Sequence, residues 1–163
     1  MSSALPDAVT EALLETPNGA RVLLLGDAAH ALAPALTTDR PDLTPVCEPL
    51  GSVPEAGKAN ERYDLGILCD LQAWGDRATA EQHIAALRDL LCKRVLVGAT
   101  PGGTVDFSRA DSLALGLKAA PTEYGKSVAR NWYKYSIIHY KRAPDWLNSD
   151  NWAHPERWNS ERW

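Results

Sequence analysis

The stretch RVLLLGDAAHALAPAL, residues 21–36, decides the expected fold. Its apolar run at 22–25 is typical of a central parallel strand that is buried on both faces. Gly26 then predicts a tight turn, and residues 28–36 predict a helix that Pro34 either ends or kinks. Strand, glycine turn and helix in this order are typical of nucleotide-binding α/β units.

Strand and helix patterns alternate along the rest of the chain. The two strongest further strands are expected at 63–70 and 94–100, a weaker one at 43–47, helices at 7–15, 79–91 and 108–115, a loop or short helix at 50–62, and a closing hairpin from 117–121 and 132–140 around Gly125. Helix-sized segments separate the three strongest strands, so these strands should be parallel. We therefore expect an α/β fold: a Rossmann-like, doubly wound, mostly parallel sheet with a C-terminal antiparallel hairpin.

Composition narrows the class of protein. The 163 residues suit one domain, and 45% hydrophobic with 23% charged residues is ordinary for a soluble globular chain. A net charge of −4 argues against nucleic-acid binding, which needs a basic surface. The N-terminus has no signal-peptide pattern, no apolar run approaches a membrane span, and the three cysteines form no CxxC pair. We expect a cytoplasmic protein with reduced thiols and neither a nucleic-acid nor a membrane partner.

The run Gly-Asp-Ala-Ala-His at 26–30 resembles the flavin-binding segment of flavin-dependent hydroxylases. In that family the run comes late in a much longer chain, and it works with an N-terminal GxGxxG turn. Here the run begins at residue 26, and no GxGxxG occurs anywhere in the sequence. We therefore expect no flavin.

The order of elements over residues 21–140 resembles class I S-adenosylmethionine-dependent methyltransferases. RVLLLGDAAH lies where that family has its first motif, and YDLGILCD followed by a helix and RVLVGAT resembles its later strands. The resemblance implies S-adenosylmethionine as cofactor. It places Gly26 and Asp27 at the polar end of the cofactor, Glu48 at the ribose hydroxyls, and Asp70 near the methyl acceptor as the catalytic residue.

This chain departs from the family pattern within the glycine-rich turn. Ala28 and His30 stand where two further glycines would let the backbone approach the cofactor, and Leu24 replaces an acid of the first strand. Two alternatives follow. The protein either transfers a methyl group to a small-molecule or protein acceptor, or it is a non-catalytic binding or scaffold protein. The two alternatives differ at His30, because a ring that projects into the cleft would obstruct the cofactor.

The C-terminal segment APDWLNSDNWAHPERWNSERW, residues 143–163, resembles the end of a bacterial family known only as a domain of unknown function. It holds four of the six tryptophans, Trp146, Trp152, Trp158 and Trp163. We expect a methyltransferase-type domain at 1–142 with this extension packed on it as a clasp. The alternative is a contact with a protein partner, or a homodimer face, because Trp and Arg favour interfaces.

Other candidate chemistry is limited. The four histidines show no metal-ligand spacing, and the sequence has no GxSxG, P-loop or HExxH motif, so we expect no metal. Asp27 and His30 form either an acid/base pair or a plain helix-start arrangement. Asp70 either acts on a ligand at the end of its strand or caps the segment that follows it.

Overall fold

A computed structural model describes residues 5–52, 62–103, 105, 107–120, 130–140 and 154–157. The helices are α1 (Asp7–Leu14), α2 (Asp27–His30), α3 (Ala33–Asp39), α5 (Arg77–Ala86), α6 (Arg109–Ala114) and α7 (Ile137–Tyr140). The strands are β1 (Arg21–Leu25), β2 (Thr44–Glu48), β3 (Leu65–Leu68), β4 (Arg94–Ala99), β5 (Lys118–Ala119) and β6 (Asn131–Ser136). Short 3-10 turns are η1 (Leu50–Ser52), η2 (Leu71–Trp74) and η5 (Pro155–Arg157), and η3 (Leu87–Leu91) is a π-helical turn.

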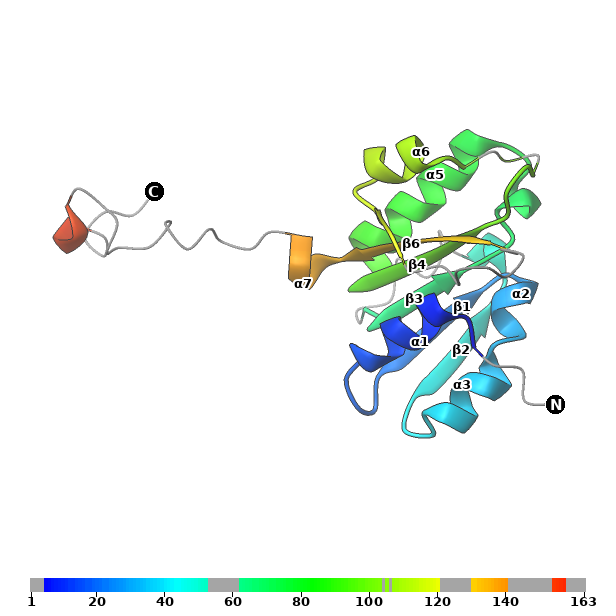
Figure 1. The fold of residues 1–163 in the computed structure, drawn as a ribbon, viewed down its shortest axis with the longest axis horizontal. Helices are drawn as coiled ribbons and strands as arrows, with labels where there is room; N and C mark the ends of the chain where they lie inside the picture. Colours follow the sequence, from blue (N-terminus) through cyan, green and yellow to red (C-terminus); the bar gives the residue numbers. More distant parts are fainter. Residues whose placement is uncertain are drawn as a thin grey trace.

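The six strands form one sheet in the order β2-β1-β3-β4-β6-β5 (Figure 1). The pairs β1–β2, β1–β3 and β3–β4 are parallel, whereas β6 runs antiparallel to both β4 and β5. This confirms the expected Rossmann-like, mostly parallel sheet with an antiparallel closing pair. β2 lies on one side of β1, and the next strand, β3, lies on the other side. The strand order therefore reverses at β1.

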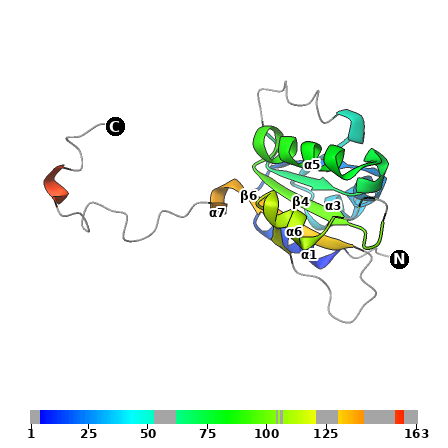
Figure 2. The same ribbon diagram turned by 90° about the horizontal axis from the view of Figure 1, so that it is seen from above.

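Helices cover both faces of the sheet, and this explains the unbroken apolar runs. In β1, Val22 and Leu24 pack into the core on the side of α1 and α3, while Leu23 and Leu25 pack into the core on the side of α5. Figures 1 and 2 show α5 on one side of the sheet and α1 on the other. A strand buried on both faces cannot alternate with polar residues, because every second side chain would bring an unpaired polar group into the core.

The helix expected at 28–36 is two helices in the structure. α2 ends at His30, and α3 begins at Ala33 with Pro34 in its first turn. Proline is well tolerated there because the first turn of a helix leaves its N–H groups without partners. Pro34 therefore starts the second helix, and the prediction that it would end or kink one continuous helix was wrong.

The closing hairpin is confirmed, with one correction. β5 and β6 pair antiparallel, but residues 137–140, expected as strand, form the short helix α7. The last pair between β6 and β4 joins Ser136 to Arg94, the first residue of β4, so no neighbouring strand remains beyond it. The loop around Gly125 and the four tail tryptophans lie outside the described residues.

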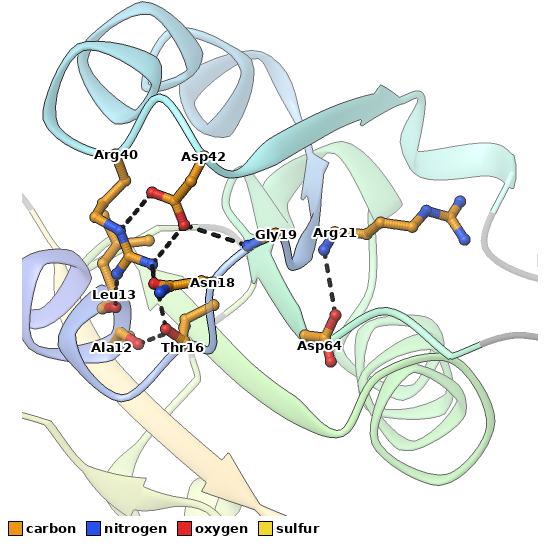
Figure 3. Close-up of polar contacts among 9 residues, drawn as sticks. All are labelled: Ala12, Leu13, Thr16, Asn18, Gly19, Arg21, Arg40, Asp42 and Asp64. Atoms are coloured by element: carbon orange, nitrogen blue, oxygen red, sulfur yellow. Dashed lines mark hydrogen bonds and ion pairs between the residues drawn. The ribbon is translucent and has the colours of Figure 1, made fainter.

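Arg40, which is half-buried, connects the end of α1 to the turn before β2 (Figure 3). Arg40 donates from Nη1 to the carbonyl oxygen of Leu13 at 2.8 Å and from Nη2 to Asn18 Oδ1 at 3.2 Å. Asp42 accepts from the same guanidinium at 2.9 and 2.8 Å. These fork-shaped bonds hold the starts of β1 and β2 side by side.

None of the helices in the described part of the chain has the length and apolar character that crossing a bilayer requires.

Candidate functional site

The carboxyl ends of three parallel strands bring the sequence-predicted residues to one edge of the sheet. Leu25, the last residue of β1, is in register with Glu48 of β2 and with Leu68 of β3. Gly26 and Asp70 follow the ends of β1 and β3, so both lie at the same edge as Glu48, with β1 between β2 and β3. Ligands of doubly wound sheets bind at this edge, where the strand order reverses.

Position 26 requires glycine because the backbone of Cys69 passes close to it. Its φ of 90° and ψ of 151° lie in a region that essentially only glycine adopts. A Cβ at this position would lie 2.5 Å from the carbonyl oxygen of Cys69 and 3.0 Å from Asp70 Oδ2. The segment that follows β3 therefore fills the space beside this turn, and α2 begins at the next residue.

Asp70 closes the turn from the neighbouring strand. Its Oδ2 accepts a hydrogen bond from the backbone N–H of Ala28 at 2.7 Å, and its Oδ1 lies 3.7 Å from Arg130 Nη2. Its φ of 62° makes it the one residue other than glycine with a positive φ among those that the structure describes. The side chain makes no capping hydrogen bond to η2, which follows it, so of the two alternatives for Asp70 the capping of the next segment is wrong. It binds the first turn of α2 instead, where a negative charge is favourable.

His30 lies between the ends of β1 and β2. Its Nε2 is 3.1 Å from the carbonyl oxygen of Leu24 and 3.0 Å from that of Glu48. Carbonyl oxygens only accept hydrogen bonds, so Nε2 carries the hydrogen and donates. The half-buried ring thus bridges the two strand ends at the edge where the resemblance places the cofactor.

The two remaining predicted carboxylates have no fixed partners in the described part of the chain. Glu48 is half-buried, and its carbonyl oxygen, not its carboxylate, accepts from His30. Asp27 is exposed. The contacts of the His30 ring are made by Nε2 to main-chain oxygens, and neither of them joins the ring to Asp27.

Two contacts, one at this edge and one between η2 and α5, were not expected from the sequence. Arg130 lies beside Asp70, although 60 positions separate the two residues, because β6 pairs with β4. Trp74 stacks on His83 with ring centroids 4.6 Å apart. No local pattern could reveal either contact, since both depend on which elements become neighbours.

Cys69, next to Asp70, is a buried thiol. Burial raises its pKa to about 12, and the nearby positive charge of Arg130 opposes this only in part. A neutral thiol is a poor nucleophile. Within the described ranges, no group of three or more His, Cys, Asp or Glu side chains is placed to hold a metal ion.

The fold is similar to solved methyltransferase structures at low sequence identity. The structure of PigF with SAH shares 12% identity at a TM-score of 0.51, over 71% of this chain and 50% of that one. A "putative O-methyltransferase" from Nostoc punctiforme PCC 73102 shares 13% identity at a TM-score of 0.50, over 78% of this chain and 55% of that one. This chain therefore spans about half the length of these two proteins, and the likeness shows the fold alone.

Relationships in sequence point to one family. No curated protein matches the chain. The model of the family of unknown function DUF6231 matches residues 4–163, nearly the whole sequence, including the tryptophan-rich segment. The chain, a methyltransferase-like Rossmann fold with a tryptophan-rich C-terminal segment, belongs to the DUF6231 family.

Proposed function

We propose that this protein is a non-catalytic binding or scaffold protein built on a methyltransferase-like fold. The observation that carries the proposal is the position of His30, whose ring donates to the carbonyl oxygens of Leu24 and Glu48 at 3.1 and 3.0 Å. In the family that the fold resembles, a glycine stands at this position, and the backbone there approaches the cofactor. Here an imidazole takes up that space.

The neighbouring turn supports the same conclusion. The N–H of Ala28 in the first turn of α2 already donates to the carboxylate of Asp70. The space next to Gly26 is taken by the carbonyl oxygen of Cys69. A cofactor at this turn would have to displace both the Asp70 carboxylate and the His30 ring. In this arrangement the residues do not fit S-adenosylmethionine.

Retained binding of S-adenosylmethionine, with transfer of its methyl group to a small-molecule or protein acceptor, is the second candidate. Glu48 favours it, because its carboxylate has no fixed partner among the described residues and stands beside the Gly26 turn. The resemblance gives an acid at this place the ribose hydroxyls of the cofactor. Asp70 would then lie nearest the acceptor.

Calorimetric titration of the full chain with S-adenosylmethionine and S-adenosylhomocysteine separates the two candidates. The proposal predicts no heat and no thermal stabilisation at millimolar ligand. Micromolar binding that is lost in Glu48→Ala would contradict it and support the second candidate. Glu81→Ala is the matched control, because it removes an equal charge from α5, away from β2.

A second variant tests the role of the ring directly. His30→Gly removes the imidazole and restores the glycine of the family pattern. If the ring is what excludes the cofactor, this variant binds S-adenosylhomocysteine more tightly than the natural chain does. The variant must first show cooperative unfolding, because the ring also joins β1 to β2.

The partner surface of such a protein would be the tryptophan-rich segment at 143–163 or a homodimer face. α7 precedes that segment in the sequence. Its residues Ile137 and Ile138 are 46% and 63% exposed. Sedimentation velocity of the full chain over a range of concentrations measures self-association. A monomer at all concentrations would leave the tryptophan-rich segment as the surface to test against other proteins.

A further inference from the structure

A pocket of about 440 Å³ opens at the amino edge of the sheet, opposite the site described above. β3 and β4 begin there and the antiparallel β6 ends there, with Arg94 paired to Ser136. The end of α1 and the turn between α6 and β5 complete the walls. Residues that define it include Glu15, Leu65, Arg94, Leu113, Leu117 and Lys134. Its volume lies in the range of small-molecule sites, about 300–1,000 Å³.

Arg94 lines this pocket as a buried cation that has no hydrogen-bonded acceptor among the residues that the structure describes. Its side chain is 7% exposed, and its Nε is buried with no hydrogen-bond partner. The carboxylate of Glu15 is 3.9 Å from Nη1, which is too long for a hydrogen bond. A guanidinium carries five N–H donors, and burying them unmatched is unfavourable.

The other carboxylate near Arg94 is committed elsewhere. Asp64 accepts from the backbone N–H of Arg21 at 3.2 Å (Figure 3) and from Lys93 Nζ at 2.9 Å. Burial lowers the pKa of Arg94, and the negative charges of Glu15 and Asp64 oppose that shift without a hydrogen bond to the guanidinium. An arginine keeps its charge in proteins, so Arg94 is a buried cation that neither of these carboxylates engages through a hydrogen bond, and it is available to an anion.

The remaining charges at the pocket leave a positive excess. Lys134 pairs with Glu11 at 2.5 Å, so these two charges balance each other. Lys118 is exposed and has no fixed partner in the described part of the chain. Among the described residues that line the pocket, Glu15, 44% exposed, is the acid that remains beside Arg94 and Lys118 once Glu11 is paired.

The walls around Arg94 are mainly aliphatic. Leu65, Leu96 and Leu117 are almost fully buried and line the pocket, and Leu113 lies at its rim with 58% of its surface exposed. We infer that this pocket binds a small monocarboxylic acid with an apolar body, its carboxylate on the Arg94 guanidinium and its hydrocarbon against these leucines. The inference stands whether or not the carboxyl edge of the sheet binds S-adenosylmethionine, because the two sites share no residue.

Octanoate is the probe, and octan-1-ol is its uncharged counterpart. We expect octanoate to bind the full chain in calorimetric titration and octan-1-ol to bind at least about tenfold more weakly, since a charge-assisted pair is lost. Equal binding of the two would overturn the inference, because the pocket would then recognise only hydrocarbon. No binding of octanoate at millimolar concentration would also overturn it.

Variants at the pocket separate recognition from folding. Arg94→Gln should weaken octanoate at least about tenfold, while Arg109→Gln, the same loss of charge at the exposed start of α6 and outside the pocket, should leave binding unchanged. Glu15→Gln should tighten octanoate, because it removes the competing carboxylate. If Arg94→Gln does not fold, the exposed rim variant Leu113→Glu replaces it and should also abolish binding. Unchanged affinity in a folded Arg94→Gln or Leu113→Glu, or weaker binding in Glu15→Gln, would overturn the inference.

Discussion

The carboxylate of Asp70 accepts a 2.7 Å hydrogen bond from the backbone N–H of Ala28, across 42 positions of sequence. The bond joins the end of β3 to the first turn of α2. It also places a negative charge at a helix start, and it holds Asp70 in a left-handed conformation that is uncommon outside glycine. A carboxylate of the chain itself therefore satisfies the N–H of Ala28 in the first turn of α2.

Replacement of Asp70 should separate the hydrogen bond from the backbone conformation. Asp70→Ala leaves the Ala28 N–H unmatched and puts alanine in the left-handed region, so we expect a loss of about 2–3 kcal/mol in the free energy of unfolding. Asp70→Asn keeps an acceptor and tolerates the left-handed region, so we expect a loss of about 1 kcal/mol. Urea unfolding measures both. The exposed Asp39→Ala serves as control, and a loss in Asp70→Ala no larger than in this control would contradict the prediction.

Alanine substitutions at two glycines with positive φ compare the cost of a steric clash with the cost of the backbone conformation alone. Gly26→Ala would place its Cβ 2.5 Å from the Cys69 carbonyl oxygen, so we expect a loss of about 3 kcal/mol or more. Gly19 has a φ of 73° but no atom near the Cβ position, so Gly19→Ala should lose only about 1–2 kcal/mol. Thermal and urea unfolding of the pair give the comparison. Similar losses would mean that the backbone at Gly26 moves away from β3 without difficulty.

The three thiols should react at very different rates. Cys47 is exposed, whereas Cys69 and Cys92 are buried, and burial raises the pKa of both buried thiols to about 12. In the native protein at neutral pH, a chromogenic disulfide reagent should therefore modify one thiol quickly, and after denaturation it should modify all three. Cys47→Ser should remove the fast phase. A fast phase that persists in this variant would show that a buried strand end opens readily.

Acid should weaken the fold partly through Asp42. The side-chain hydrogen bond from Arg40 holds the pKa of Asp42 well below its usual range. A lowered folded pKa means that the contribution is present above the pKa of the unfolded chain and is lost as the pH falls toward the folded value. The free energy of unfolding should therefore drop on acidification below about pH 4, and Asp42→Asn should drop less steeply. Asp39→Asn is the control, and equal slopes in the two variants would remove Asp42 as a cause.

The strands were predictable because of how they are buried. The runs at 22–25, 65–68 and 94–99 are nearly all apolar, and only strands covered on both faces require that pattern over so short a length. The glycine after the first run predicted the turn, and the helix that separates the later runs predicted their parallel pairing. The Pro34 break and the helix at 137–140 were missed, because both depend on where neighbouring elements begin and end.

The site was predictable only in part. The sequence placed Gly26, Glu48 and Asp70 at strand ends, and parallel strands bring such ends to one edge. It did not indicate that the Asp70 carboxylate would bind Ala28, because that contact needs β3 to lie beside β1. Nor could it show which way the His30 ring would turn, since its two acceptors belong to β1 and to the end of β2.

By itself the sequence determined the class of fold. Its apolar runs have the length and the lack of alternation that suit a parallel sheet covered by helices on both faces, and only glycine tolerates the turn after the first strand. The tertiary structure decided what each edge of that sheet presents. Strand order and register set Asp70 against Ala28, His30 between two strand ends, and the Arg94 guanidinium within an aliphatic pocket. The physical reason is that hydrogen bonds and charge pairs act over a few ångströms, so they depend on which distant segments become neighbours.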